Sequence, residues 1–326
     1  MNILVTGATG FLGSNLAAAL VEQGHRVRIL RRATSRLDAL AGIDVEHHIG
    51  DIEDRASIDK AIAGCEVVFH TAAISQYWLN DNATTYRVNI EGTRNVLAAA
   101  KQAGVRRVVH TSSVAALGYG AANALLDETH DLPESQYWWP YGHSKHLAEQ
   151  VVHDAVADGL DAVIVNPTII VGPRDVNFIS GSIITASMRG QLRVAPPGGA
   201  NFAHVDNVVA GHVAAAEKGR VGERYILGGE NLSYVEMARI AHDVTGGAGP
   251  MLVLPKWSLP PLAWLVDFYN SIRKSPPVMT GERMRLGGET FYFNTSKAEK
   301  ELDLPKTSFR QALIDTYTWY REHGFI

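Results

Sequence analysis

The chain contains 326 residues, of which 46% are hydrophobic and 20% are charged, and these values are ordinary for a soluble globular enzyme. The formal net charge of −4 provides no basic surface for nucleic acid or for an anionic membrane, so we expect neither as a partner. The single cysteine, Cys65, excludes a disulfide framework within the chain and is expected to be a small buried hydrophobic residue, which fits a cytoplasmic location.

The first stretch of the chain predicts a strand, a tight turn and a helix. Asn2–Thr6 is a short apolar run typical of a buried parallel strand, and Phe11–Val21 has the pattern of an amphipathic helix. Glycines recur between them at three-residue intervals, where they let main-chain N–H groups approach a pyrophosphate at a helix N-terminus. We therefore predict a dinucleotide site here, with contacts from Gly7, Thr9, Gly10, Phe11, Leu12 and Gly13. The chain enters this strand without a charged segment or cleavage site, so we expect no signal peptide.

Strands and helices then alternate along the chain. The further expected strands are His25–Leu30, Val45–Ile49, Glu66–His70, Arg107–Ser112 and Asp161–Val165, and the expected helices are Glu53–Ala63, Thr84–Ala103 and Tyr141–Ala157. This alternation predicts an α/β fold with a doubly wound parallel sheet and right-handed crossovers.

The composition changes from Asn166 onward, because proline and glycine cluster and mark loops. Phe202–Glu217 is expected to be a strand end and a helix, and Glu223–Leu227 a further strand, both returning to the sheet. Ser308–His323 predicts a terminal amphipathic helix. We predict a nucleotide-binding domain over residues 1–166, to which the chain returns at about 203–227, and a smaller C-terminal α/β substrate domain over 167–202 and 228–326.

No run of about eighteen apolar residues predicts a membrane span. The nearest approach is Leu252–Tyr269, which three prolines, Lys256 and Asp267 interrupt. We expect a buried loop and helix there, with a membrane-surface helix as the alternative.

Tyr141 and Lys145 are four residues apart at the start of a predicted helix, so both side chains lie on one face. The reference pKa of tyrosine is about 10, which makes it a poor acid–base group at neutral pH. A nearby ammonium group favours the phenolate and allows the phenol to exchange a proton with a carbonyl or alcohol oxygen. The pair follows a predicted strand that ends in Thr111-Ser112-Ser113, in a chain that begins with the glycine turn.

TGATGFLG at positions 6–13, together with Thr111-Ser112-Ser113, Gly118, Tyr141 and Lys145, resembles the extended short-chain dehydrogenase/reductase family of the NAD-dependent epimerase/dehydratase superfamily. The resemblance implies a Rossmann-type sheet, an enzyme that transfers hydride, and a homodimer formed through the helices Thr84–Ala103 and Tyr141–Ala157. It implies that Tyr141 is the proton donor or acceptor and that Lys145 holds the nicotinamide ribose. Ser113, or Ser112 as the fallback, is implied to hydrogen-bond the reacting oxygen.

The type of nicotinamide cofactor is predicted from the end of the second strand. An NAD site usually has an acidic residue about twenty residues beyond the glycines, whereas this chain has Arg31 and Arg32, and its nearest acid is Asp38. Arginine can pair with a 2′-phosphate, so we favour NADP(H), with NAD(H) as the alternative. The resemblance implies further cofactor contacts from Asp51, Ile52, Thr71, Ala72, Ala73, Thr111, Asn166, Pro167 and Thr168.

Two branches of the resembled family differ in substrate. One contains nucleotide-sugar epimerases and dehydratases, and the other contains reductases similar to dihydroflavonol 4-reductase and bacterial hopanoid-associated sugar epimerase-like proteins. The first branch typically has arginine where this chain has Ala200, although Arg174, Arg189, Arg193 and Arg283 remain available for a diphosphate. Val165-Asn166-Pro167-Thr168 is closer to the reductase form.

Aromatic residues near the expected reaction centre favour a small apolar or aromatic substrate. The candidate substrate residues are Ser75, Tyr77, Trp78 and Trp139, and the alternative is that these rings pack between the domains. We therefore predict an NADP(H)-dependent reductase of a ketone or aldehyde, with an NAD-dependent nucleotide-sugar epimerase/dehydratase as the alternative. A cofactor-sensing or scaffold protein is a third hypothesis. None of the thirteen histidines has the spacing of a zinc site, so no metal is expected.

Overall fold

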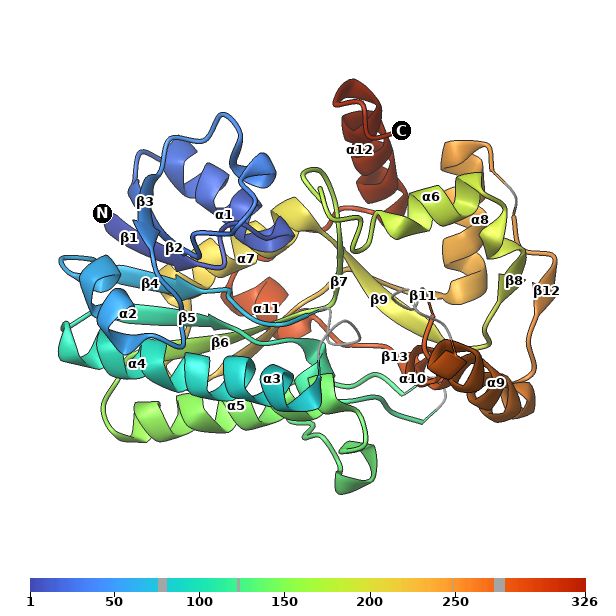
Figure 1. Ribbon diagram of the computed structural model, residues 1–326, viewed down its shortest axis with the longest axis horizontal. Helices are drawn as coiled ribbons and strands as arrows, with labels where there is room; N and C mark the ends of the chain where they lie inside the picture. The colour runs from blue at the N-terminus through green and yellow to red at the C-terminus, as the bar shows by residue number, and fades with distance from the viewer. Residues whose placement is uncertain (76–80, 122–123, 248, 273–278) are drawn as a thin grey trace.

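The computed structural model describes residues 1–75, 81–121, 124–247, 249–272 and 279–326. The chain forms a large parallel sheet with helices on both faces, and a smaller sheet with its own helices lies beside it (Figure 1).

Seven of the described strands form the large sheet in the order β10-β6-β5-β4-β1-β2-β3, and every pairing is parallel. The strands are β1 (Asn2–Thr6), β2 (Arg26–Arg31), β3 (Glu46–Ile49), β4 (Val67–His70), β5 (Arg107–Thr111), β6 (Ala162–Pro167) and β10 (Arg224–Leu227). Successive side chains of a strand point to opposite faces, so Ile3 and Val5 enter one hydrophobic core and Leu4 enters the other. The prediction of a doubly wound parallel sheet is confirmed.

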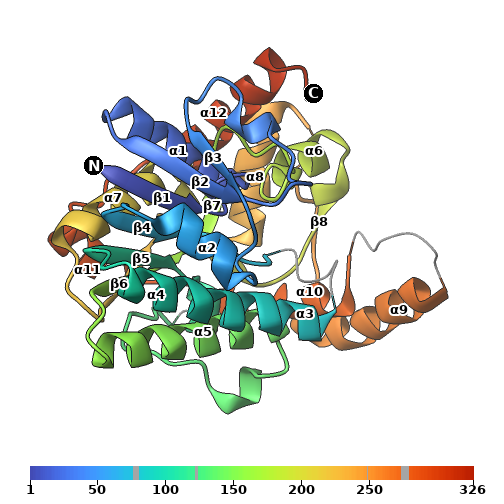
Figure 2. The ribbon, with the colours of Figure 1, turned by 60° about the vertical axis from the view of Figure 1, so that its left-hand side comes forward.

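Helices cover both faces of this sheet, as its near-continuous apolar strands require. One face carries α1 (Phe11–Glu22) and α7 (Val205–Lys218), and α11 (Ser296–Glu301) packs beside β10. The other face carries α2 (Arg55–Ile62), α4 (Gly92–Gln102) and α5 (Pro140–Ala157) (Figure 2). The predicted helix Thr84–Ala103 is three joined segments, α3 (Asn82–Tyr86), a π-helical segment (Arg87–Glu91) and α4.

The smaller sheet is built around β9 (Gly199–His204), which pairs with β7, β11 and β13. The remaining elements are β7 (Ile169–Val171), α6 (Ser182–Met188), β8 (Val194–Ala195), β11 (Glu230–Ser233), α8 (Tyr234–Thr245), β12 (Leu252–Val253), α9 (Leu259–Ile272), α10 (Gly281–Leu286), β13 (Thr290–Phe291) and α12 (Phe309–Glu322). Residues of β9, α8 and α12 share a third hydrophobic core, which holds this unit together.

Two expectations from the sequence are wrong in this half of the chain. The strand that ends near Phe202 does not return to the large sheet, because β9 pairs with β7, β11 and β13 of the smaller sheet. The helix α7 does return, and among the described strands of this half β10 alone joins the large sheet. Apolar periodicity identifies a buried strand but not the sheet that receives it. The stretch Leu252–Tyr269 is not buried either, since most of its large apolar side chains are exposed. Within the described residues, no helix combines the length and apolar character needed to cross a membrane.

Candidate active site

The glycine turn joins β1 to α1 at the carboxyl edge of the large sheet. Gly7 has φ +76°, and a Cβ placed there would lie 2.6 Å from the backbone nitrogen of Ala72. A Cβ at Gly13 would lie 2.4 Å from the carbonyl oxygen of Gly7. Gly10 is the N-cap of α1, and no described side chain caps this helix end with a hydrogen bond. Such a helix end favours anions.

The end of β4 lies directly against this turn. The backbone N–H and the hydroxyl of Thr71 donate to the carbonyl oxygen of Thr6 at 3.2 and 2.7 Å. The two ring nitrogens of buried His70 lie 2.7 and 3.1 Å from the hydroxyls of Thr6 and Thr93. The structure therefore brings the predicted cofactor residues Thr71, Ala72 and Gly7 together, and Ala73 follows them in the chain.

The predicted adenosine-side residues follow β2 and β3. Arg31 ends β2, and its Nε donates to Nδ1 of His47 on β3 at 2.9 Å, whereas Arg32 is exposed. The nearest acid, Asp38, is engaged with Arg36 at 2.7 Å. Ile52 is buried against Gly92, and the carboxylate of the preceding Asp51 accepts the backbone N–H of Glu53. The arginines thus lie at the edge where a 2′-phosphate is expected.

Tyr141 and Lys145 lie in the first turns of α5, which starts at Pro140, a residue well suited to the first position of a helix. The Tyr141 hydroxyl hydrogen-bonds the side chain of Ser113. Burial raises the pKa of Tyr141, and the Ser113 hydrogen bond offsets part of that rise. Lys145 is buried, and its Nζ donates to the carbonyl oxygen of Thr111 at 2.9 Å. Burial lowers the pKa of Lys145 to about 8, and the carboxylate of Glu149 opposes that fall.

The two candidate serines have different surroundings. The Ser113 hydroxyl also accepts the backbone N–H of Ala115 at 3.2 Å, which fixes it at the start of a short 3₁₀ turn after β5. The buried Ser112 hydroxyl instead lies near the buried carboxyl of Glu149 and lowers its pKa, but it has no hydrogen-bond partner among the described residues. Of the two serines, only Ser113 contacts Tyr141 in the described structure. Ser113 is therefore the serine placed to act together with the tyrosine.

A buried network behind Lys145 was not foreseen from the sequence. Asn166 Nδ2 donates to Glu149 Oε1 at 2.6 Å and to the carbonyl oxygen of Ser113 at 3.0 Å. Arg224 Nε lies 3.2 Å from Glu149 Oε2. Burial raises the pKa of Glu149, while Arg224, Ser112, Asn166 and Lys145 all lower it. The spacing from Lys145 to Glu149, one helical turn, was the available sequence indication.

Asn89 was also missed, and it lies in the π-helical segment between α3 and α4. Its Oδ1 accepts the backbone N–H of Ile74 at 2.8 Å, and its Nδ2 donates to the Ser144 hydroxyl at 3.0 Å. The Ser144 hydroxyl in turn donates to the carbonyl oxygen of Tyr141 at 2.8 Å. Asn89 thus ties the chain after β4 to the helix that carries Tyr141.

The remaining predicted cofactor residues lie at or after the ends of β5 and β6 and in the glycine turn and first turn of α1. The Thr111 hydroxyl lies 2.9 Å from His212 Nε2, so this side chain faces α7. Pro167 ends β6, and the Thr168 N–H donates to the carbonyl oxygen of Leu227 at 3.2 Å. The Phe11 side chain is in the core, whereas Thr9 and Leu12 are half-buried.

The predicted substrate residues do not form one group. Trp139 is buried, with ring centroids 6.1 Å from Tyr141 and 5.7 Å from Phe291. It belongs to a hydrophobic cluster with Leu286 of α10 and therefore packs between the large sheet's edge and the C-terminal part of the chain. Ser75 is exposed, and Tyr77 and Trp78 lie outside the described residues.

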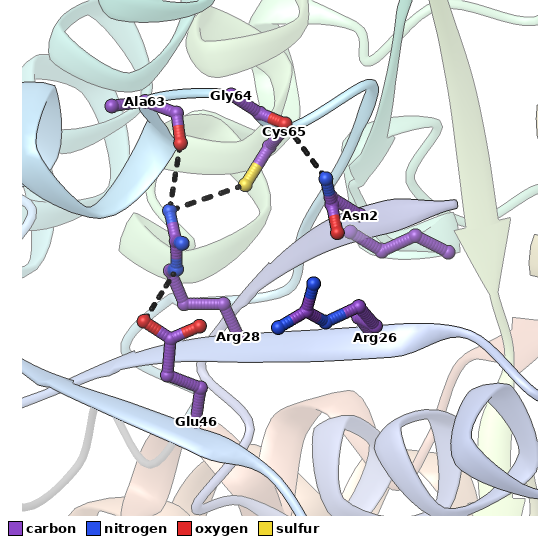
Figure 3. Close-up of a pocket in the computed structure, with 8 residues that line it drawn as sticks. Asn2, Arg26, Arg28, Glu46, Ala63, Gly64 and Cys65 are labelled. Carbon is purple, nitrogen blue, oxygen red and sulfur yellow. Dashed lines mark hydrogen bonds and ion pairs between the residues drawn. The ribbon is translucent and has the colours of Figure 1, made fainter.

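A hollow of about 130 Å³ lies at the opposite, amino edge of the large sheet (Figure 3). Arg28 fills one side of it, donating to the carbonyl oxygen of Ala63 at 2.9 Å and lying 3.2 Å from the carboxylate of Glu46. Cys65 lines the hollow and is buried, as predicted, and burial raises its thiol pKa. Because Asn2 and the glycine turn are at opposite ends of β1, this hollow is separate from the candidate active site. Across the described part of the chain, no group of three or more His, Cys, Asp or Glu residues could hold a metal ion.

Known proteins resemble this chain over nearly its whole length. A family model described as the NAD dependent epimerase/dehydratase family matches residues 3–228. A dihydroflavonol 4-reductase-like protein of Synechocystis sp. is 37% identical over 327 residues, which cover 99% of this chain and 95% of that protein. Sterol demethylase protein B of Methylococcus capsulatus is 37% identical over 332 residues, covering 100% of both chains. The crystal structure of gox2253 has a TM-score of 0.87 at 38% identity and covers 99% of this chain and 98% of that chain.

Proposed function

The chain belongs to the NAD-dependent epimerase/dehydratase family, and we propose that it is an NADP(H)-dependent reductase of a ketone or aldehyde in an apolar or aromatic substrate. Membership makes it an NAD(P)-dependent oxidoreductase of the extended short-chain dehydrogenase/reductase type. The observation that carries the proposal is the buried Tyr141 hydroxyl, hydrogen-bonded to Ser113, with the Lys145 ammonium one helical turn away.

The backbone around the glycine turn fits a dinucleotide. A Cβ at Gly7 would lie 2.6 Å from the backbone nitrogen of Ala72, and one at Gly13 would lie 2.4 Å from the carbonyl oxygen of Gly7. Both glycines therefore allow the close turn that leads into the first turn of α1, where a pyrophosphate would meet main-chain N–H groups. Thr71–Ala73 would border one ribose, and Lys145 would hold the nicotinamide ribose. When bound, the nicotinamide cofactor supplies a hydride to the carbonyl carbon.

Tyr141 supplies the proton that the reduced oxygen needs. Because burial raises the pKa of Tyr141, the phenol is protonated at neutral pH and able to donate to the carbonyl oxygen, which becomes a hydroxyl. Ser113 would hydrogen-bond the same oxygen and fix its position. Lys145 favours the phenolate that remains after transfer, since an ammonium stabilises an adjacent negative charge. Solvent then restores the Tyr141 proton.

Arg31 and Arg32 support the choice of NADP(H). Arg31 ends β2 and Arg32 follows it, at the position where an acidic residue would bind the 2′-hydroxyl of NAD, and Asp38 is already paired with Arg36. A guanidinium at this edge complements a 2′-phosphate and offers it a charge-assisted hydrogen bond.

The substrate class rests on two observations. The cluster beside Tyr141 contains Trp139, Leu286 and Phe291 and is apolar. Two relatives are named for a dihydroflavonol and a sterol, which are both multi-ring compounds. As in the resembled family, we further propose a homodimer in which α4 and α5 of the two copies pack together.

The test begins with protein stripped of co-purifying nucleotide. Calorimetric titration is expected to give a dissociation constant for NADPH about tenfold or more below that for NADH, equivalent to about 1.4 kcal/mol. Ring-containing ketones and aldehydes are then screened for NADPH oxidation. The Tyr141→Phe variant is expected to bind NADPH normally and to lose turnover. Retention of NAD through purification, with no binding of NADPH, would overturn the reductase assignment, and turnover by Tyr141→Phe would overturn the role of the tyrosine.

A further inference from the structure

Trp139 carries a polar group that the described fold does not use. The side chain is 6% exposed, and its indole Nε1 is buried without a hydrogen-bond partner among the described residues. Buried donors in native proteins are nearly always paired, because a donor that leaves water without finding an acceptor costs free energy. An unpaired buried donor at a candidate active site points to an acceptor on a bound molecule.

The surroundings of the indole are apolar apart from two tyrosine hydroxyls. Its cluster contains Ala115 and Leu286, with Ile74, Tyr119, Tyr141 and Phe291 packed against them. The ring of Phe291 meets the indole edge-on, with centroids 5.7 Å apart and an interplanar angle of 72°. A Cβ at Gly142 would lie 2.7 Å from Cε3 of the indole, so this ring rests directly on α5. These contacts hold an aromatic ring in place but make no use of the N–H group.

The indole lies beside the residue that supplies the proton. Trp139 directly precedes α5, and its ring centroid is 6.1 Å from that of Tyr141. The members of the cluster that come from the C-terminal part of the chain are Leu286 of α10 and Phe291 of β13. A ring compound that enters between these two parts, with its carbonyl group at Tyr141, would therefore lie against the indole.

We propose that Nε1 of Trp139 donates a hydrogen bond to a second oxygen of the substrate, separate from the carbonyl oxygen that is reduced. This inference rests on the proposed reductase function. A carbonyl oxygen has two lone pairs, and the hydroxyls of Tyr141 and Ser113 would occupy both. The indole donor is then left for another acceptor, about the width of one ring away.

The proposal narrows the class of substrate. It is a ring ketone or aldehyde with a further carbonyl, hydroxyl or ether oxygen, and not a compound whose other heavy atoms are all carbon. An apolar pocket discriminates only weakly between such compounds. A buried donor discriminates strongly, because an analogue without the second oxygen leaves the donor unpaired.

The test compares Trp139→Phe with the wild type on matched pairs of ring ketones. Chroman-4-one and 1-tetralone are the first pair, because they share a two-ring framework in which a ring oxygen of the first replaces a methylene group of the second. Further pairs place the second oxygen elsewhere on the rings. Phenylalanine keeps an apolar ring and removes the N–H group. The control is Trp319→Phe, the same substitution in α12, where the indole stacks on His323 with centroids 4.4 Å apart.

Trp139→Phe is expected to lower kcat/KM about tenfold for the oxygen-bearing member of at least one pair, and to lower it much less for the other member. Trp319→Phe is expected to leave both members at the wild-type level. Equal losses for the two members of every pair would overturn the proposal, because they would show that the indole only packs there. An ordered water on Nε1 would serve both members alike and give the same result.

A second readout needs no turnover. The Trp139 Nε1–H signal is identified in a ¹H–¹⁵N spectrum of the protein with NADP⁺, as the one of six indole signals that Trp139→Phe lacks. It is expected to move to lower field when the oxygen-bearing ketone binds, and not when its matched partner binds. Equal movement for both members of every pair would overturn the proposal.

The two assays separate this inference from the function on which it rests. If no ring ketone binds or is reduced, the proposed reductase function fails, and the role of the indole fails with it. If ring ketones are reduced but Trp139→Phe treats the members of every pair alike, only the role of the indole N–H fails.

Discussion

The buried carboxyl of Glu149 gives the sharpest test of how the candidate site operates. Glu149→Gln removes the negative charge and keeps an oxygen that can accept the hydrogen bond from Asn166 Nδ2, now 2.6 Å from Oε1. In the native protein burial lowers the pKa of Lys145 to about 8, and Glu149 holds it from falling further. Without that charge the pKa of Lys145 falls again, so the ammonium loses its proton at a lower pH.

The size of this effect follows from the helix geometry. Groups at i and i+4 on a helix are about 6 Å apart, and two unit charges at that distance interact by about 3 kcal/mol at an effective dielectric constant of about 20. That corresponds to about two pH units, and partial neutralisation of Glu149 by Arg224 reduces it to about one. We therefore expect the alkaline fall in kcat/KM to move about one to two pH units toward acid.

The assay is the pH profile of kcat/KM for carbonyl reduction with saturating NADPH, from mildly acidic to mildly alkaline pH. The control is Asp131→Asn, which removes another carboxylate bound to Arg224, at 2.7 Å, but one that is 66% exposed. Because solvent screens this charge, its profile is expected to move by no more than about a few tenths of a pH unit. A profile of Glu149→Gln that matches the wild type, or an equal shift in both variants, would refute the electrostatic link between Glu149 and Lys145.

The other predictions concern the serines, the glycine turn and the cofactor. Ser113→Ala is expected to lower kcat/KM about a hundredfold or more, because it removes the hydroxyl beside the tyrosine. Ser112→Ala is expected to retain most activity, because the Ser112 hydroxyl lies behind the site, near the buried carboxyl of Glu149. Steady-state kinetics of both variants test this order, and the reverse order would assign the role to Ser112. Gly13→Ala is expected to weaken NADPH binding more than tenfold in calorimetry, because its Cβ would lie 2.4 Å from a carbonyl oxygen. The control is Gly24→Ala, where the glycine has φ +79° and a Cβ would meet nothing within 4 Å. This variant is expected to lose about 1 kcal/mol of stability and to bind NADPH normally. Equal NADPH binding by both variants would contradict the role of Gly13 in the dinucleotide site. Arg31→Ala is expected to weaken NADPH binding about tenfold and to leave NADH binding unchanged. An equal loss of affinity for both cofactors would show that Arg31 does not contact the 2′-phosphate.

Sequence reasoning succeeded where structure is local. The strand, turn and helix at the N-terminus depend on apolar periodicity and on glycine conformation within thirteen residues, so Asn2–Thr6 and the start of α1 at Phe11 were placed correctly. Tyr141 and Lys145 share a helix face because four residues make nearly one turn, a property of any α-helix. The parallel sheet followed in the same way from the alternation of elements.

Contacts between distant parts of the chain could not be predicted from the sequence. The end of β5 beside α5 determines which serine faces Tyr141. The pairing of β6 with β10 brings Asn166 and Arg224 together around Glu149. No local pattern encodes such pairings, because packing selects among the elements that periodicity allows. The same reason explains why α9 was expected in the core: the composition of a helix shows that it is apolar, but only its neighbours in the fold determine whether that apolar face is covered.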